Sequence, residues 1–402
     1  MTFRLASVSL LDQGSVDIDI DNQRITAISP AASTSTNAEV FNLTGHVLVP
    51  SFVEPHAHLD KAFLADRISN PTGDLLGAIH GLEEVRDTIT FDDIVYRAVT
   101  AAQLLSRNGV TSVRTHADMT LDGGLTSVLA LLEAKRLCRS FIDIQVAMLL
   151  GWPLTGSGSE NIRSLAQEAI GAGVDVVGGC PHLDETPEKA VEYLLQLALD
   201  NDLPLDIHAD ENLRATSRDL EHLADLMLAD KIAHQVTASH CVSLSIQGVD
   251  VIGRTAEKAA QAGIAVVALP HTNLFLQGRD LISSKPRAIT PVDALRQAGV
   301  IVAAGADNIQ DPFNPMGRAD PLETASLMVL AAHQSPVDAL DMVTTAASQV
   351  VHNRRSHIAV GEIANLVAIP ASNIREAIAM GPPDRFVVYG GVVISNQERN
   401  IK

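Results

Sequence analysis

Two histidines separated by one residue, His56 and His58, stand at the end of a short apolar run that begins near Val47. In an extended strand, residues two apart point to the same face, so both imidazoles would project together while Ala57 points the other way. Two imidazoles held in this way can share one metal ion. The pair alone is a weak signal, because paired histidines also occur at strand ends by chance.

Three further apolar runs end on a residue that can bind a metal or move a proton: His208, His240 and Asp307. Imidazole nitrogens and a carboxylate oxygen suit a single Zn²⁺ or Fe²⁺ with one position open to water, and such an ion lowers the pKa of that water from about 15.7 toward 7. We assign His240 as the group that orients or deprotonates the water. The expected ligands of this one divalent ion are His56, His58, His208 and Asp307.

Glu211 lies three residues after His208 and would reach the same pocket from the following loop. Expulsion of an amine needs a proton donor, because an amide anion is a very poor leaving group. Glu211 is our candidate for this general acid, although its spacing also fits a solvated loop carboxylate. Two other residues keep a second interpretation as well: Asp307 as the cap of the next helix, and His240 as a core histidine.

The middle of the chain, from about residue 51 to 350, alternates apolar runs with amphipathic stretches, which is typical of a parallel α/β fold. Eight such units over roughly 300 residues fit a (β/α)₈ barrel, in which catalytic groups lie at the carboxyl ends of the strands. His116 and His271 also fall at or just past strand ends, but no role in the site is left open for them. The expected exterior helices span 91–108, 124–138, 186–200 and 318–333. The expected strands are Phe52–His58, Thr111–Ala117, Ile142–Leu150, Val174–Gly179, Leu205–His208, Gln235–His240, Ile264–Leu269 and Val300–Ala306.

Both ends of the chain contain strand-like segments, such as Val16–Ile20 and Phe386–Ile394, with Gly390 and Gly391 as a plausible hairpin turn in the second. We expect one small β domain built from residues 1–50 and 357–402, and a catalytic barrel domain over residues 51–356.

The composition excludes several classes of partner. The 402-residue chain carries a formal net charge of −19, which would repel phosphate backbones and anionic membrane surfaces, so we expect neither nucleic acid nor a membrane as a partner. The three cysteines form no Cys-x-x-Cys pair, which argues against a redox motif and favours a cytoplasmic location. We expect no secretory signal, because the first residues lack a basic region followed by a continuous apolar region, and no run of about 18 uncharged apolar residues predicts a membrane span.

With these residues placed, the chain resembles the amidohydrolase superfamily, and within it the cytosine deaminase-like branch. The matching segments run in order through almost the whole chain. They are Pro50–Asp60, Val113–Asp118, Asp206–Glu211, Val236–His240, Leu276–Arg279 and Gly305–Pro312.

The resemblance implies an α/β fold made of a distorted (β/α)₈ TIM barrel and a small β-sandwich domain from both termini. It implies one Zn²⁺ or Fe²⁺ per subunit, held by the four ligands named above, and a homo-oligomer. It further implies that Glu211 carries a proton to the ring nitrogen and then to the leaving amine, while His240 and Asp307 activate the water. The His-x-Glu and Pro-Cys-x-x-Cys signature of the other zinc deaminases is absent from the sequence.

Two positions depart from the cytosine deaminase pattern. Leu150 stands near the place of a glutamine that pairs with the pyrimidine edge, and Asn308 replaces a second acidic residue beside the metal aspartate. Losing a partner for a buried polar edge costs on the order of 1–3 kcal/mol, so we do not expect cytosine as the preferred substrate. An apolar substituent or fused ring could instead face Met148, Leu150 and Trp152. The expected substrate-binding residues are Leu150, Trp152, Gln277, Asn308 and Phe313.

We predict a hydrolase that acts on carbon–nitrogen bonds other than peptide bonds. It would deaminate a cyclic amidine in a small nitrogen heterocycle, such as a pyrimidine, a triazine or a pterin, and release ammonia after attack by a metal-bound hydroxide. The nearest alternative is a cyclic amide hydrolase or an N-dealkylating amidohydrolase with the same site. A non-catalytic binding barrel is more remote, because the metal ligands and Glu211 are all present. The sequence leaves the choice among Zn²⁺, Fe²⁺ and Mn²⁺ open.

Overall fold

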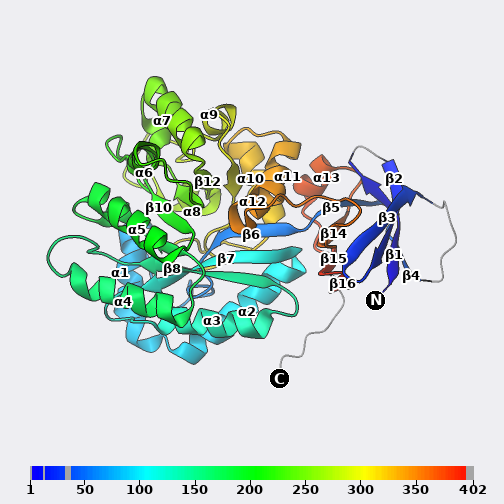
Figure 1. Ribbon diagram of the computed structural model, residues 1–402, viewed down its shortest axis with the longest axis horizontal. Helices are drawn as coiled ribbons and strands as arrows, with labels where there is room; N and C mark the ends of the chain where they lie inside the picture. Colours follow the sequence, from blue (N-terminus) through cyan, green and yellow to red (C-terminus); the bar gives the residue numbers. More distant parts are fainter. Residues whose placement is uncertain (1, 12–13, 32–37, 395–402) are drawn as a thin grey trace.

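The computed structural model describes residues 2–11, 14–31 and 38–394. A barrel wrapped in helices occupies most of the molecule, and a second, smaller sheet lies at one side of it, where N-terminal and C-terminal strands meet (Figure 1). The predicted fold class, an α/β barrel with a small β domain from both termini, is confirmed.

The barrel sheet contains eight strands that follow one another in chain order, and each pairs in parallel with the next. Their side chains are almost all buried, as expected for a parallel sheet covered on its outer face by helices. The strands are β6 (Phe52–Ala57), β7 (Val110–Met119), β8 (Asp143–Leu150), β9 (Val177–Gly179), β10 (Leu205–Ala209), β11 (Val236–His240), β12 (Ala265–Ala268) and β13 (Val302–Ala304).

The barrel closes where the chain just after β13 meets β6. Ala57 and Asp307 form a parallel bridge there. The amide of His58 donates to the carbonyl of Asp307 at 3.1 Å, and the amide of Asp307 donates to the carbonyl of His56 at 3.0 Å. The closure of the sheet therefore brings three of the four expected metal ligands to one place.

Helices cover the outside of the barrel (Figure 1). The four exterior helices expected from the sequence are present with ends that differ by at most three residues: α2 (Phe91–Arg107), α3 (Thr126–Cys138), α5 (Pro187–Asn201) and α10 (Pro321–Ala331). The remaining α-helices are α1 (Leu75–Val85), α4 (Ser159–Ala172), α6 (Asp219–Ala229), α7 (Val249–Ala262), α8 (Pro270–Leu276), α9 (Val292–Gln297), α11 (Pro336–Val343), α12 (Thr345–His352) and α13 (Ile374–Met380). Short 3₁₀ turns span Arg86–Thr88, Pro181–Leu183 and Ser243–Ile246.

The small sheet joins segments that lie more than 300 residues apart in sequence, because β5 pairs antiparallel with β14, with Val49 opposite Val367. One face of this sheet buries its own apolar cluster, which includes Leu5, Ile18 and Leu366. The expected hairpin at Gly390 and Gly391 connects β15 to β16, while residues 395–402 of the expected β domain lie outside the described residues. The strands are β1 (Phe3–Leu10), β2 (Gly14–Asp21), β3 (Arg24–Pro30), β4 (Glu39–Asn42), β5 (His46–Pro50), β14 (Leu366–Pro370), β15 (Phe386–Tyr389) and β16 (Val392–Val393).

None of the helices in the described part of the chain has both the length and the apolar character needed to cross a membrane.

Candidate active site

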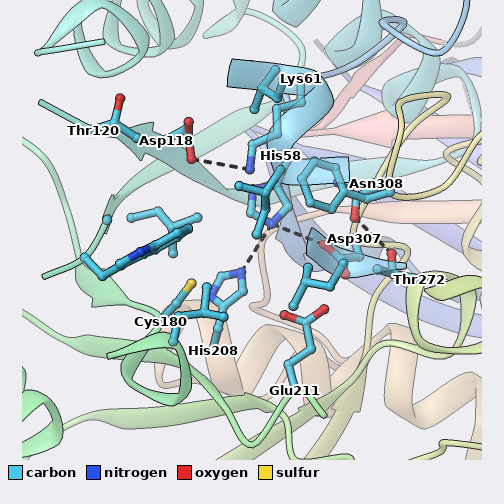
Figure 2. Close-up of a pocket in the computed structure, with 18 of the residues that line it drawn as sticks. His58, Lys61, Asp118, Thr120, Cys180, His208, Glu211, Thr272, Asp307 and Asn308 are labelled. Atoms are coloured by element: carbon cyan, nitrogen blue, oxygen red, sulfur yellow. Dashed lines mark hydrogen bonds and ion pairs between the residues drawn. The ribbon is translucent and has the colours of Figure 1, made fainter. Parts of the chain in front are cut away.

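Four side-chain atoms converge at the carboxyl end of the barrel. The Nε2 atoms of His56 and His58 lie 3.2 and 3.3 Å from Nε2 of His208. Oδ1 of Asp307 lies 3.2 Å from Nε2 of His58 and 3.7 Å from Nε2 of His56. Figure 2 shows His58, His208 and Asp307 pointing toward one another inside the pocket. The structure thus gathers all four expected ligands around one point.

This arrangement fits one divalent metal ion. Tetrahedral bonds of 2.0–2.1 Å place ligand atoms about 3.4 Å apart, and the observed separations of 3.2–3.7 Å lie on both sides of that value. Burial, together with the neighbouring imidazoles, holds the pKa of His56 and of His208 well below the usual range, so these rings are neutral as metal ligation requires. Neither carboxylate oxygen of Asp307 accepts a hydrogen bond from the described residues.

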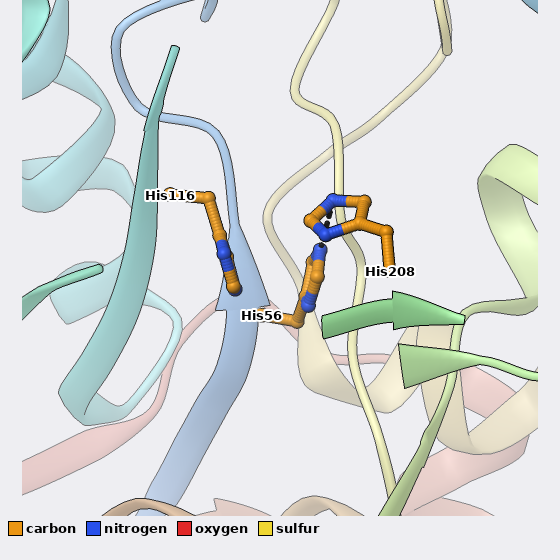
Figure 3. Close-up of side chains that lie close together, drawn as sticks. All are labelled: His56, His116 and His208. Atoms are coloured by element: carbon orange, nitrogen blue, oxygen red, sulfur yellow. Dashed lines mark hydrogen bonds between the residues drawn. The ribbon is translucent and has the colours of Figure 1, made fainter. Parts of the chain in front are cut away.

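His116 lies against this cluster but is not one of the four expected ligands His56, His58, His208 and Asp307. Its ring stacks on His56 with centroids 4.0 Å apart and planes 30° apart (Figure 3). His56, His116 and His208 also form a group compact enough to hold an ion. The set with Asp307 suits a divalent cation better, because the carboxylate offsets part of its charge in a buried place. We assign His116 a packing role against the face of His56.

A hydrogen-bonded chain fixes which nitrogen of His56 faces the metal position. Ser239 Oγ donates to Asp206 Oδ1 at 2.8 Å, and Asp206 Oδ2 accepts from Arg114 at 2.8 Å. Since the single proton of the Ser239 hydroxyl is used on Asp206, its oxygen accepts from Nδ1 of His56, which lies 2.9 Å away. His56 therefore carries its proton on Nδ1 and leaves Nε2 free as a ligand.

Glu211 and His240 lie beside the metal position in complementary proton states. Burial, reinforced by the charge of Asp307, raises the pKa of Glu211 well above its usual range, which favours its protonated form. His240 Nδ1 donates to Asn273 Oδ1 at 3.1 Å, which leaves Nε2 free, 3.7 Å from Oε2 of Glu211. Burial lowers the pKa of His240. The pair thus offers one proton donor and one neutral acceptor at the same point.

His182 lies near Glu211 and is a residue of the site that the sequence did not predict. Its Nδ1 donates to the carbonyl of His208 at 2.9 Å, and its Nε2 lies 3.9 Å from Oε2 of Glu211. The signal that could have found it is its place after β9, in a loop at the carboxyl end of a barrel strand.

The cluster opens into a pocket of about 690 Å³, measured with its mouth. Four of the expected substrate-binding residues line it, and one does not. The lining includes Leu150, Trp152, Asn308 and Phe313. Gln277 is outside this lining, and its side-chain amide donates to the backbone carbonyl of Glu211 at 3.2 Å. Met148, expected to face a fused ring, is fully buried in the barrel core instead.

The pocket also has walls that sequence reasoning did not find. Helix α1 contributes three apolar side chains, Leu75, Ile79 and Leu82. Lys61 and Asp118 add charges on the side of His58 away from Glu211 in Figure 2. Lys61 lies three residues after His58, and Asp118 lies in β7 two residues after His116. This closeness in sequence to histidines at strand ends was the available signal.

Comparisons with known proteins agree with this geometry. A sequence model described as "Amidohydrolase family" matches residues 92–397. A pterin deaminase from Rhizobium rhizogenes is 28% identical over 385 residues, which cover 94% of this chain and 87% of that protein. The crystal structure of 5-methylcytosine deaminase from Klebsiella pneumoniae with 5-fluorocytosine superposes with a TM-score of 0.89 at 29% identity, covering 99% of both chains. The structure of N-isopropylammelide isopropylaminohydrolase from Burkholderia multivorans gives a TM-score of 0.83 at 26% identity, with 98% of both chains covered.

Proposed function

This chain belongs to the amidohydrolase family and is a hydrolase of carbon–nitrogen bonds, and we propose that it deaminates a cyclic amidine in a substituted or fused nitrogen heterocycle. The resemblance to cytosine deaminase-like enzymes is confirmed by these relatives. The observation that carries the proposal is the position of the buried Glu211 carboxyl group, 3.7 Å from Nε2 of His240 and beside the four converging ligand atoms.

The proposed chemistry assigns one task to each group. His56, His58, His208 and Asp307 would hold one Zn²⁺ or Fe²⁺, which when bound acts as a Lewis acid that makes water a nucleophile near neutral pH. His240, with Nε2 free, accepts a hydrogen bond from the attacking water and orients it. Glu211 gives its proton to the ring nitrogen as the water oxygen bonds to the amidine carbon. It then takes up one proton from the water and passes it to the amino group, so that the carbon–nitrogen bond breaks and ammonia leaves. The second proton on the former water oxygen returns to Glu211 as the ring carbonyl forms, which restores the starting carboxyl group.

The pocket favours a substituted or fused ring over cytosine. Leu150 offers no hydrogen bond to a ring amide, and with Trp152, Leu75 and Ile79 it forms an apolar surface around the space beside the metal position. Such a surface accommodates a second ring or an alkyl substituent, as a pterin or a 5-substituted pyrimidine would present. The pterin deaminase and 5-methylcytosine deaminase among the relatives support the same choice.

The rival chemistry is removal of an alkylamine from a ring carbon. The N-isopropylammelide isopropylaminohydrolase among the relatives, at 26% identity, supports this second reaction as a candidate. The same groups could perform it, because Glu211 would protonate an alkylamino group in the same way as an amino group. The products separate the two reactions, since one gives ammonia and the other an amine.

The test measures ammonia and alkylamine release by protein loaded with Zn²⁺ or Fe²⁺. The panel contains pterins, cytosine, 5-methylcytosine, isocytosine, creatinine and N-alkylated triazines, with Glu211→Gln as the blank. We expect ammonia from a pterin or a substituted pyrimidine, little from cytosine, and none from the variant. Cytosine as the best substrate would refute the proposed ring class, and alkylamine as the main product would establish the rival chemistry.

A further inference from the structure

Three charged side chains in the pocket wall take no part in the proton transfers proposed above. Arg86 donates from both terminal nitrogens to Oδ2 of Asp118, each at 3.1 Å. The other oxygen of Asp118 lies 3.7 Å from Nζ of Lys61. All three residues line the same pocket as His58 and Glu211.

The side chain of Lys61 is mostly buried and its ammonium borders the pocket, where no hydrogen bond joins it to the described part of the protein. Only 6% of the residue is exposed. Its distance of 3.7 Å to Asp118 is too long for a hydrogen bond, and its other close contact is the face of Phe313, whose ring centre is 5.1 Å away. An ammonium has three N–H donors. A ligand in the pocket that offers an acceptor can therefore bind these donors.

The charge of Lys61 is maintained by its surroundings. The carboxylate of Asp118, whose Oδ1 lies 3.7 Å from Nζ, balances a positive charge at this position. The ammonium therefore faces the pocket as a cation with unused donors. Next to it, Oδ1 of Asp118 is a carboxylate oxygen that Arg86 does not engage.

This inference rests on the proposed deamination: we propose that Lys61 and Asp118 recognise a lactam edge of the substrate ring. The carbonyl oxygen of the lactam accepts a hydrogen bond from Nζ of Lys61, and the neighbouring ring N–H donates to Oδ1 of Asp118. Lys61 enters from the side of His58 away from Glu211 (Figure 2), so a ring held in this way presents a different position to Glu211. The substrate class is thus an amino heterocycle that carries a ring oxo group together with a second ring or an apolar substituent. Cytosine carries the same lactam edge but would leave the apolar wall of Leu75, Ile79, Leu150 and Trp152 unfilled.

Binding measured by calorimetry tests this inference without relying on turnover. The titrated protein is loaded with Zn²⁺ and carries Glu211→Gln, so that the rings bind without being deaminated. The two pairs of rings differ in the oxo group: isocytosine against 2-aminopyrimidine, and pterin against 2-aminopteridine. We expect this protein, with Lys61 intact, to favour the lactam of each pair. Lys61→Met should weaken lactam binding roughly 10- to 100-fold, the range of a hydrogen bond to a charged group, and should leave binding of the oxo-free ring within about threefold.

Matched variants separate recognition from folding. Lys189→Met, at an exposed position on α5, should change neither affinity. Lys61→Gln keeps a neutral donor and should give an intermediate loss for the lactam, and it serves if Lys61→Met does not fold. Equal weakening of both rings of a pair, no weakening of either, or no lactam binding by the protein with Lys61 intact would each overturn the inference. Lactam selectivity that depends on Lys61, together with a wild type that releases no ammonia from any ring, would instead refute the proposed deamination alone.

Discussion

At the scale of single residues, groups outside the metal position decide how the site histidines point. His56 and His240 each use Nδ1 to donate a proton to a fixed oxygen, of Ser239 and Asn273 respectively, and so keep Nε2 free. The backbone at His240 and Asp307 is left-handed, with φ of 71° and 66°. Such backbone costs about 1–3 kcal/mol for a residue other than glycine and is concentrated at functional sites.

Ser239→Ala tests the chain that orients His56. The variant removes the oxygen that accepts from Nδ1 and leaves Asp206 without that donor. We expect Zn²⁺ affinity to fall roughly 10- to 100-fold, measured by competition with a chromophoric chelator. Ser112→Ala is the control, because the buried hydroxyl of Ser112 has no hydrogen-bond partner among the described residues. Unchanged affinity in Ser239→Ala would show that the chain does not set the tautomer.

Spacing along the chain predicts which residues gather at the proposed metal position, but it does not predict the whole pocket. The carboxyl ends of all barrel strands meet at one end of the barrel. His56, His208 and Asp307 each stand at or near such a strand end, so they could be placed together from sequence alone. Lys61 and His182 lie in loops after the strands, where no periodicity says which way a side chain points. The prediction that Gln277 contacts the substrate rested on the resemblance to the family alone. In the structure its side-chain amide donates to the backbone carbonyl of Glu211.

At the scale of elements, the strands and exterior helices follow from hydrophobic periodicity, whereas α1 does not. Its sequence contains Gly77 and Gly81, which disfavour a helix by about 1 kcal/mol each relative to alanine. The structure gives the reason for the second glycine: a Cβ at Gly81 would lie 2.5 Å from the carbonyl oxygen of Ser69. The loop packed under α1 thus requires a residue that weakens the local helix signal.

Glu221 gives a pH-dependent test of how α6 and α7 pack. Burial opposes its charge, but hydrogen bonds from Arg254, Lys258 and Arg218 outweigh burial and lower the pKa of Glu221 to about 2. An unfolded glutamate titrates near 4.3, so the stabilisation is complete above that pH and is lost as the pH falls toward 2. We expect Glu221→Gln to lower the free energy of unfolding by about 2 kcal/mol at pH 6, allowing for solvent around the partly exposed cations.

Urea unfolding of both proteins at pH 6 and at pH 3 measures this effect. The difference between wild type and variant should shrink by more than half at pH 3. A difference that stays constant between the two pH values would contradict the assignment of the charge to Glu221.

At the scale of the whole molecule, a buried ion pair ties the C-terminal strands to the barrel. Arg385, just before β15, donates to both carboxylate oxygens of Asp320 at 2.8 Å and to the carbonyl of Asn108 at 2.7 Å. Removing one partner of a buried pair leaves the other charge uncompensated. The sequence predicted that both ends of the chain form one β domain. It could not predict the contacts of Arg385, because Asp320 and Asn108 lie 65 and 277 residues away from it in the chain.

We expect Arg385→Ala to lower the free energy of unfolding by about 3–5 kcal/mol, measured by urea denaturation followed by circular dichroism. Arg136→Ala is the control, since Arg136 pairs with Glu133 on the exposed surface of α3 and its loss should leave the stability close to that of the wild type. Equal effects of the two substitutions would show that the Arg385 pair does not hold the two parts together.

The central claim is that one divalent ion at His56, His58, His208 and Asp307 supports deamination. The most direct measurement strips the protein with a chelator, titrates Zn²⁺ back in, and follows bound metal and ammonia release together. Activity should rise from near zero in proportion to bound Zn²⁺ and reach its plateau at one ion per chain, while Asp307→Ala neither binds tightly nor turns over substrate. Ammonia release by the stripped protein, or a plateau at two ions, would contradict the account.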